Sequence, residues 1–334
     1  MPLVVNGVMV DKLSSDTISL FEMYPSVKEY SRTFLNQPRK TITSYGSLYV
    51  LQREFALVNP SDPYVNILGT DAATTCNMVV LRHPETGMTA CGHFDGSGTE
   101  DCIREMIRKV HNSGTSIDIH SGLELHMIGG FIDANGYSKD LCQKILCSFH
   151  RQAISIHLIT ACICEVNNTV RGGVNLPIVR GIAVYVKTGE IFPASFVDKG
   201  PDVPLRSSRL LTSGSPGMLE IYDSYNGFMK IGPFNYQPVR GIDLWLAGGD
   251  DLILKHLSTS PEAEDANFVN ETRRTLTFIR DNPFPSITVF PEEKPRYYAK
   301  DEYGNWVLVT HNSYYSPDTF HLKSKNFASN QLKP

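Results

Sequence analysis

Short runs of alternating apolar and polar residues recur along most of the chain, and this period of two is typical of β-strands. From Ser47 onward the runs follow one another closely and are rich in β-branched and aromatic residues, which favour strands. They read SLYVLQREFALV, YVNILGT, NMVVLRH, MTACGHF, LELHMIGGF and ISIHLITACICEV. The pattern predicts one short strand near the amino terminus and a sheet that begins at about Ser47.

Three further stretches pair apolar runs around turn residues and therefore predict β-hairpins. Their turns lie at Thr188-Gly189, Tyr225-Asn226-Gly227 and Tyr303-Gly304-Asn305.

Helical periodicity is clearest from Thr99 to Val110, where one face collects five apolar side chains and Gly114 follows the end. These are Cys102, Ile103, Met106, Ile107 and Val110. Further helices are predicted from the caps Ser15 and Asp16 towards Leu35, from Lys139 to Phe149, from Asp250 to Leu257, and from about Pro261 to Arg280. Hairpins mixed with helices predict an α+β fold of layered antiparallel or mixed β-sheets with packed helices.

Composition excludes several classes of protein. The 334 residues are 41% apolar and 20% charged, with a formal charge of −4, which argues against disorder and against a nucleic-acid or anionic-membrane partner. No apolar run approaches the ~18–20 residues that span a bilayer, and the amino terminus carries no basic n-region. We expect a cytoplasmic protein that can diffuse into the nucleus.

The seven cysteines form no CxxC repeat and no regular framework, so neither disulfides nor a zinc knuckle is predicted. His120 and His126 have no third ligand at a metal spacing. We expect no metal and no organic cofactor.

The stretch from Leu68 to Gly96 carries the candidate chemistry. Cys76 follows a loop of hydroxyl-bearing and small residues and directly precedes an apolar strand. At the mouth of a strand, its own backbone N–H and that of a neighbour can point towards a developing oxyanion.

The segment from Asn77 to His93 is predicted to form a hairpin. Pro84 suits the first position of the turn, and Gly87 suits a position with left-handed backbone conformation. With the even-numbered loop Pro84 to Gly87, Cys76 and His93 project from one sheet face, with Cβ atoms roughly 5–8 Å apart. A thiol beside an imidazole forms the thiolate–imidazolium pair that acyl transfer needs. The alternative is that Cys76 is a core residue and His93 a structural histidine, as most such residues are.

The segment LGTDAATTCNMVVLRH resembles the nucleophile segment of the protein N-terminal asparagine amidohydrolases. The resemblance continues in order through LELHMIGGF, IHLITACICEVN, PIVRGIAVYVKTGEIFPASFVDKGP, LSTSPEAE and FVNETRRTLTFI. It implies a single amidohydrolase domain over residues 1–310, a flexible tail over 311–334, and a monomer. It also implies a hydrolase of linear amides that converts N-terminal asparagine of proteins and peptides to aspartate with release of ammonia, feeding the N-degron pathway.

A more distant likeness reaches the chemotaxis-receptor glutamine deamidases. Those enzymes have a Cys and a His 17 residues apart, as Cys76 and His93 are, and a Thr that falls on Thr70. Their Gly-Gly strand resembles Gly129-Gly130.

Both likenesses imply that the Cys76 thiolate attacks the amide, that His93 protonates the leaving ammonia, and that a thioester is then hydrolysed by water which His93 deprotonates. Thr70 would orient the imidazole or donate a hydrogen bond to the oxyanion. The alternative is that its hydroxyl, at the end of a strand, hydrogen-bonds to backbone groups and has no catalytic role.

A free α-ammonium in a pocket requires a carboxylate. The candidates are Glu264 first, Asp95 second and Asp71, with Thr75 as a further substrate-binding residue. A mature N-terminal Pro2 could lie near the site. Two rival functions remain: deamidation of an internal Gln or Asn in a folded partner, and a non-catalytic protein-binding module.

Overall fold

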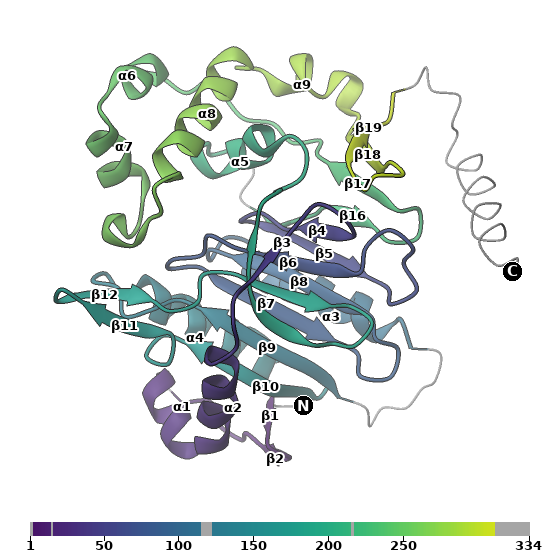
Figure 1. The fold of residues 1–334 in the computed structure, drawn as a ribbon, viewed down its shortest axis with the longest axis vertical. Coiled ribbons are helices and arrows are strands. Elements are labelled where there is room, and N and C mark those ends of the chain that lie inside the picture. Colours follow the sequence, from purple (N-terminus) through teal and green to yellow (C-terminus); the bar gives the residue numbers. More distant parts are fainter. Residues whose placement is uncertain (1–2, 15, 115–121, 215–216, 311–334) are drawn as a thin grey trace, which may run out of the picture.

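The main sheet of the computed structural model, which describes residues 3–14, 16–114, 122–214 and 217–310, has eight strands among those residues (Figure 1). Their order is β15-β5-β8-β7-β9-β10-β1-β2, with parallel and antiparallel pairs mixed. The bounds are β1 Leu3–Val5, β2 Val8–Met9, β5 Glu54–Val58, β7 Asn77–Arg82, β8 Thr89–Phe94, β9 Leu123–Gly129, β10 Ile156–Ile163 and β15 Leu219–Glu220.

A second sheet lies against one face of the main sheet, in the order β3-β14-β13-β6-β4. Its strands are β3 Lys40–Ile42, β4 Ser47–Tyr49, β6 Ile67–Thr70, β13 Ile182–Tyr185 and β14 Ile191–Phe196. Two smaller sheets are formed by β11 Asn168–Arg171 with β12 Val174–Pro177, and by β16 Tyr222–Asp223, β17 Phe228–Ile231, β18 Arg296–Lys300 and β19 Trp306–Leu308.

The alternation of side chains gives each face of the main sheet its own core. Met78, Val80 and Cys91 pack towards the second sheet, where they join Leu68 and Ile182. The alternate residues on the opposite face are covered by α3 (Thr99–His111) and α4 (Tyr137–His150). The helices and the two sheets thus form stacked layers.

A group of helices covers the ends of both sheets, at the top of Figure 1. It comprises α5 Val203–Leu211, α6 Ile242–Ala247, α7 Asp250–Leu257, η1 Pro261–Ala263, α8 Phe268–Asp281, α9 Pro285–Thr288 and η2 Pro291–Glu293. Ile253, Leu276 and Ile279 from this group enter the core between the sheets, so these helices close one end of it.

The predicted α+β class is confirmed, as are the hairpins at the three turns and the helix α7. All five apolar residues predicted for one face of α3 are buried. Within the described residues no helix combines the length and the apolar character that crossing a membrane would require.

Three predicted elements differ in detail. The first helix is interrupted at Pro25, which cannot donate a backbone hydrogen bond, giving α1 (Thr17–Met23) and α2 (Pro25–Leu35). Asp16 caps α1 by accepting from the Ser19 N–H at 2.8 Å, whereas Ser15 lies outside the described residues. SLYVLQREFALV is divided at Arg53, where φ is +61°, into β4 and β5 of different sheets.

The third difference concerns the helix predicted from about Pro261 to Arg280. It is the short turn η1, and α8 begins only at Phe268. Glu264 lies on the non-helical connection between them.

Candidate active site

Cys76 and His93 project from the same face of the main sheet. Met78 pairs with His93, Arg82 with Thr89, and the His83 N–H donates to the Met88 carbonyl at 2.9 Å. The intervening loop is therefore the even-numbered Pro84 to Gly87, as predicted. Cys76 packs in the core between the two sheets, on the Met78 side, although it is only the residue before β7.

The thiol and the imidazole line one cavity of about 650 Å³. Cys76 is 9% exposed and His93 is 3% exposed, so both are largely withdrawn from bulk water but border an open space. The walls come from the loop before β7, the end of β8, the first turns of α4, and the segment from Leu257 to Thr275. Segments far apart in sequence thus enclose the pair.

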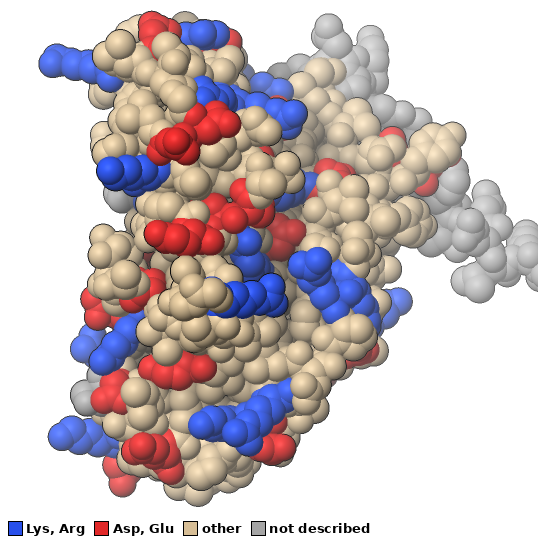
Figure 2. All heavy atoms as spheres, turned by 60° about the vertical axis from the view of Figure 1, so that its left-hand side comes forward, with Lys and Arg blue, Asp and Glu red and all other residues tan. Residues whose placement is uncertain are grey.

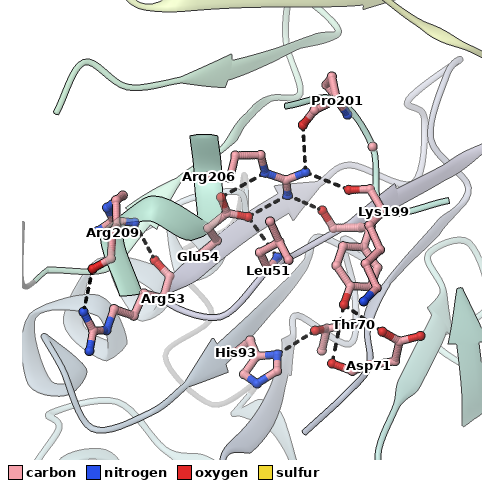
Figure 3. Close-up of polar contacts among 12 residues, drawn as sticks. Leu51, Arg53, Glu54, Thr70, Asp71, His93, Lys199, Pro201, Arg206 and Arg209 are labelled. Atoms are coloured by element: carbon pink, nitrogen blue, oxygen red, sulfur yellow. Dashed lines mark hydrogen bonds and ion pairs between the residues drawn. The ribbon is translucent and has the colours of Figure 1, made fainter. Parts of the chain in front are cut away.

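Thr70 fixes the imidazole. Its Oγ1 lies 2.7 Å from Nδ1 of His93, and the Thr70 side chain is fully buried at the end of β6 (Figure 3). Three roles were left open for Thr70: orienting the imidazole, donating to the oxyanion, or bonding backbone. The contact with Nδ1 is the one expected of a residue that orients the ring. Nε2 of His93 is buried and has no hydrogen-bond partner among the described residues, which leaves that nitrogen free for another group.

Gly129 and Gly130 hold the backbone of Cys76. The Gly130 N–H donates to the Cys76 carbonyl at 2.9 Å. Gly129 has φ of +130°, and a Cβ there would lie 2.5 Å from that carbonyl oxygen, so a side chain is excluded. The Gly-Gly strand therefore allows β9 to approach the cysteine closely.

Burial and the neighbouring charges favour the neutral forms of both groups. Burial, then the Asp95 and Glu264 carboxylates, raise the pKa of the Cys76 thiol. Burial, opposed by the Asp95 carboxylate and assisted by Lys199, lowers the pKa of His93 to about 4. These shifts favour a neutral thiol beside a neutral imidazole. The sequence pattern alone predicts a thiolate–imidazolium pair instead.

Asp95 and Asp71 are already held by neighbours. Asp95 Oδ2 accepts from Arg53 at 2.6 Å and from Gln52 at 2.8 Å. Burial acts to raise the pKa of Asp95, but the Ser97 N–H, Gln52 and Arg53 together lower it. Asp71 accepts from the Tyr49 hydroxyl and from the Phe196 N–H, both at 2.7 Å, which ties its loop to β4 and β14.

Glu264 is a largely buried cavity carboxylate with spare acceptor capacity. Its Oε1 accepts from Ser258 at 2.6 Å, but Oε2 has only the Arg180 guanidinium at 3.9 Å. Burial raises the pKa of Glu264. An incoming cation would favour its ionised form.

Thr75 also lines the cavity, with its hydroxyl 2.9 Å from that of Thr259. The structure adds lining residues that the sequence did not single out: Arg53, Lys199, Asp265 and Glu271. Lys199 Nζ lies 2.9 Å from Glu271 Oε1, and these residues are 72 positions apart. No local motif joins such a pair.

Among the described residues no three His, Cys, Asp or Glu side chains gather to hold a metal ion. Pro2 and His120 lie outside the described residues.

Replacing Thr70 by valine is expected to lower kcat for the amide hydrolysis expected from the sequence about 10²-fold. KM should stay nearly unchanged, because the imidazole loses only the hydroxyl that orients it. Steady-state kinetics on the variant measure this. Thr70→Ser, which keeps the hydroxyl, is the control and should recover most of the rate. Equal activity in Thr70→Val and the parent would contradict the orienting contact.

Acid is expected to destabilise the fold through His93. Its pKa is about 4 in the folded chain and 6.5 ordinarily, so the unfolded chain binds the proton more tightly. The stabilisation is complete above about pH 6.5 and is lost as the pH falls to about 4, a change of about 3 kcal/mol. Urea unfolding across this window measures it, and His93→Gln should flatten the pH dependence.

Comparison with known proteins assigns the chain to the amidohydrolases. The sequence model of the family described as "Protein N-terminal asparagine amidohydrolase" matches residues 37–308. A protein of that name from Sus scrofa is 41% identical over 93% of this chain and 98% of its own length. The Homo sapiens protein is 40% identical over 93% and 99%, and the Arabidopsis thaliana protein is 31% identical over 90% and 92%. The chain belongs to the protein N-terminal asparagine amidohydrolase family.

Proposed function

We propose that this protein hydrolyses the side-chain amide of an N-terminal asparagine on proteins and peptides, releasing ammonia and leaving N-terminal aspartate. The observation that carries the proposal is that Cys76 and His93 lie on one sheet face and line one cavity, which Glu264 also lines. The names of the relatives support the substrate.

The reaction begins from the neutral pair. With Nδ1–H donating to Thr70, Nε2 of His93 has a free lone pair that takes the thiol proton as sulfur attacks the amide carbon. The C–N bond then breaks, and the imidazolium returns this proton to the departing nitrogen, which leaves as ammonia. A thioester on Cys76 remains. Nε2 next accepts a proton from water, the resulting hydroxide attacks the thioester, and the protonated imidazole restores the thiol as aspartate departs.

Backbone amides beside Cys76 supply the oxyanion site in this scheme. In the described part of the chain, the N–H groups of Thr75 and Cys76 donate no hydrogen bond to backbone or side-chain acceptors. They are free to bind the oxygen that becomes negative in the tetrahedral intermediate, where one such donor is worth about 3 kcal/mol.

The charge of the cavity suits a free amino terminus. Its lining has six acidic residues, Asp71, Asp95, Asp140, Glu264, Asp265 and Glu271, against three basic ones, Arg53, Lys144 and Lys199. Arg53 and Lys199 are engaged by Asp95 and Glu271. Burial, and after it the Asp95 and Glu264 charges, raise the thiol pKa; an α-ammonium beside Glu264 would offset those charges, so substrate binding favours sulfur ionisation.

A blocked amino terminus tests this proposal against its rivals. Ammonia release is measured on an Asn-starting peptide, on its N-acetylated form, and on matched peptides that start with Gln or carry only an internal Asn. We expect turnover of the free Asn peptide alone. Equal rates on the acetylated peptide would favour an internal deamidase, and no release from any peptide would favour a binding module.

Glu264→Gln is expected to lower kcat/KM for the free Asn peptide roughly 10–100-fold, mainly through KM, because a charged hydrogen bond to the α-ammonium is lost. Glu262→Gln is the matched control, since Glu262 is exposed, lies two positions away and does not line the cavity. A smaller effect in Glu264→Gln than in Glu262→Gln would assign the ammonium to another carboxylate.

We further propose that residues 1–310 form the one amidohydrolase domain. The core between the sheets supports this, because it joins Phe34 to Tyr298. The product, an N-terminal aspartate, is the proposed link to the N-degron pathway.

A further inference from the structure

A second cavity of about 670 Å³ adjoins the catalytic one. The shared wall consists of Asp71, Ala72, Lys199, Ser207, Asp265, Glu271 and Thr275, which line both spaces. The Lys199–Glu271 ion pair is therefore part of the boundary. A chain bound with its first residue in the catalytic cavity has this second space directly beside it.

The part of the second cavity that is not shared is basic. It contains Arg39, Arg180 and Arg274 against the single acid Asp198. Arg39 and Arg274 are exposed and form no hydrogen bond or ion pair with another described residue. Nε and Nη2 of Arg180 are buried without a hydrogen bond to another described residue, and Nη2 lies 3.9 Å from Glu264 Oε2, with which it forms an ion pair.

The acids around this cavity are already engaged. Asp198 accepts from the Gly200 N–H at 2.8 Å, Asp265 from the Asn267 N–H at 2.8 Å, and Glu271 is paired with Lys199. Asp71 is held by the two contacts described above. The guanidinium groups of Arg39 and Arg274 are thus left for an anion from outside.

The unshared parts of the two cavities differ in charge: the first has three acids against two bases, and the second has three arginines against one acid. Figure 2 shows acidic side chains in a band across the middle of one face, with basic side chains directly below. A peptide with a positive amino terminus and negative side chains further along would match this polarity.

We propose that the second cavity binds carboxylate side chains of the substrate downstream of its N-terminal asparagine, so that the enzyme prefers acidic segments there. This rests on the proposed function. Arginine suits the role because its planar guanidinium binds a carboxylate through two parallel hydrogen bonds.

The test compares Asn-starting peptides of equal length that carry Glu, Gln or Lys at each of the second to sixth positions in turn. The Glu peptide is expected to exceed the Gln peptide roughly two- to five-fold in kcat/KM at one or two positions, mostly through KM, and the Lys peptide to fall below both. The advantage should shrink as salt rises. Equal rates for Glu and Lys at every position would overturn the proposal.

A charge reversal gives the sharper arm. In the Arg39→Glu/Arg274→Glu protein the preference should invert, so that the Lys peptide becomes the better substrate. Arg171→Glu, at an exposed arginine of β11 that lines neither cavity, is the control for net charge and should keep the acidic preference. An acidic preference that survives the double reversal would overturn the proposal. If the parent protein turns over no peptide at all, the proposed function itself fails, and this outcome is distinct.

Discussion

Replacing Cys76 by alanine is expected to reduce ammonia release from an Asn-starting peptide roughly 10⁴–10⁶-fold, because the nucleophile and its thioester are lost together. The fold should change little, since Cys76 borders a cavity and its thiol makes no hydrogen bond with another described residue. The measurement is ammonia release beside a urea unfolding curve. Mass spectrometry of the parent protein during turnover should also detect the thioester, which the variant cannot form.

Cys91→Ala is the matched control for this prediction. Cys91 is also buried, lies on β8 and faces the same core, but does not line the catalytic cavity. It should cost some stability by leaving a small void and retain most of the turnover. Undiminished turnover in Cys76→Ala would remove the thiol mechanism, whatever the Cys91 result.

Removing one partner of the Glu54–Arg206 pair is expected to destabilise the fold by about 3–5 kcal/mol. The two side chains are 3% and 0% exposed, with Arg206 Nη2 at 2.6 Å from Glu54 Oε2. Arg206 also donates to the carbonyls of Tyr49 and Lys199, at 2.9 and 2.7 Å (Figure 3). Arg206→Met would leave a buried carboxylate and these carbonyls unsatisfied.

Urea unfolding of Arg206→Met, Glu54→Gln and the double variant measures this loss. The double variant should be more stable than the sum of the single losses predicts, because neither charge is then left alone. The exposed pair Arg104–Asp101, with side chains 67% and 86% exposed, provides the control, and Arg104→Met should cost less than about 1 kcal/mol. An equally small loss in Arg206→Met would show that the buried pair adds nothing to the free energy of unfolding.

Local features of the sequence were sufficient to predict the structure of segments whose conformation depends on their own residues. Pro84 and Gly87 specify the loop length that places Cys76 and His93 on one face, and the period of α3 identifies its buried residues. These are short-range effects of turn chemistry and of helical or strand periodicity.

Contacts between distant segments were not predictable in this way. Glu54 meets Arg206 across 152 positions, and Lys199 meets Glu271 across 72. Periodicity tells which face of an element is buried but not which other face it meets. Glu264 was singled out only through resemblance, and its local structure was predicted wrongly, because the pattern from Pro261 suits a helix that in fact begins at Phe268.

The short contact between Thr70 and His93 joins a strand of the second sheet to a strand of the main sheet. A slight slide of one sheet over the other would lengthen this contact before any strand separates. Gentle warming, or truncation of a side chain such as Val184 in the shared core, should therefore slow turnover at temperatures where circular dichroism still reports an intact molecule. Inactivation would then precede melting.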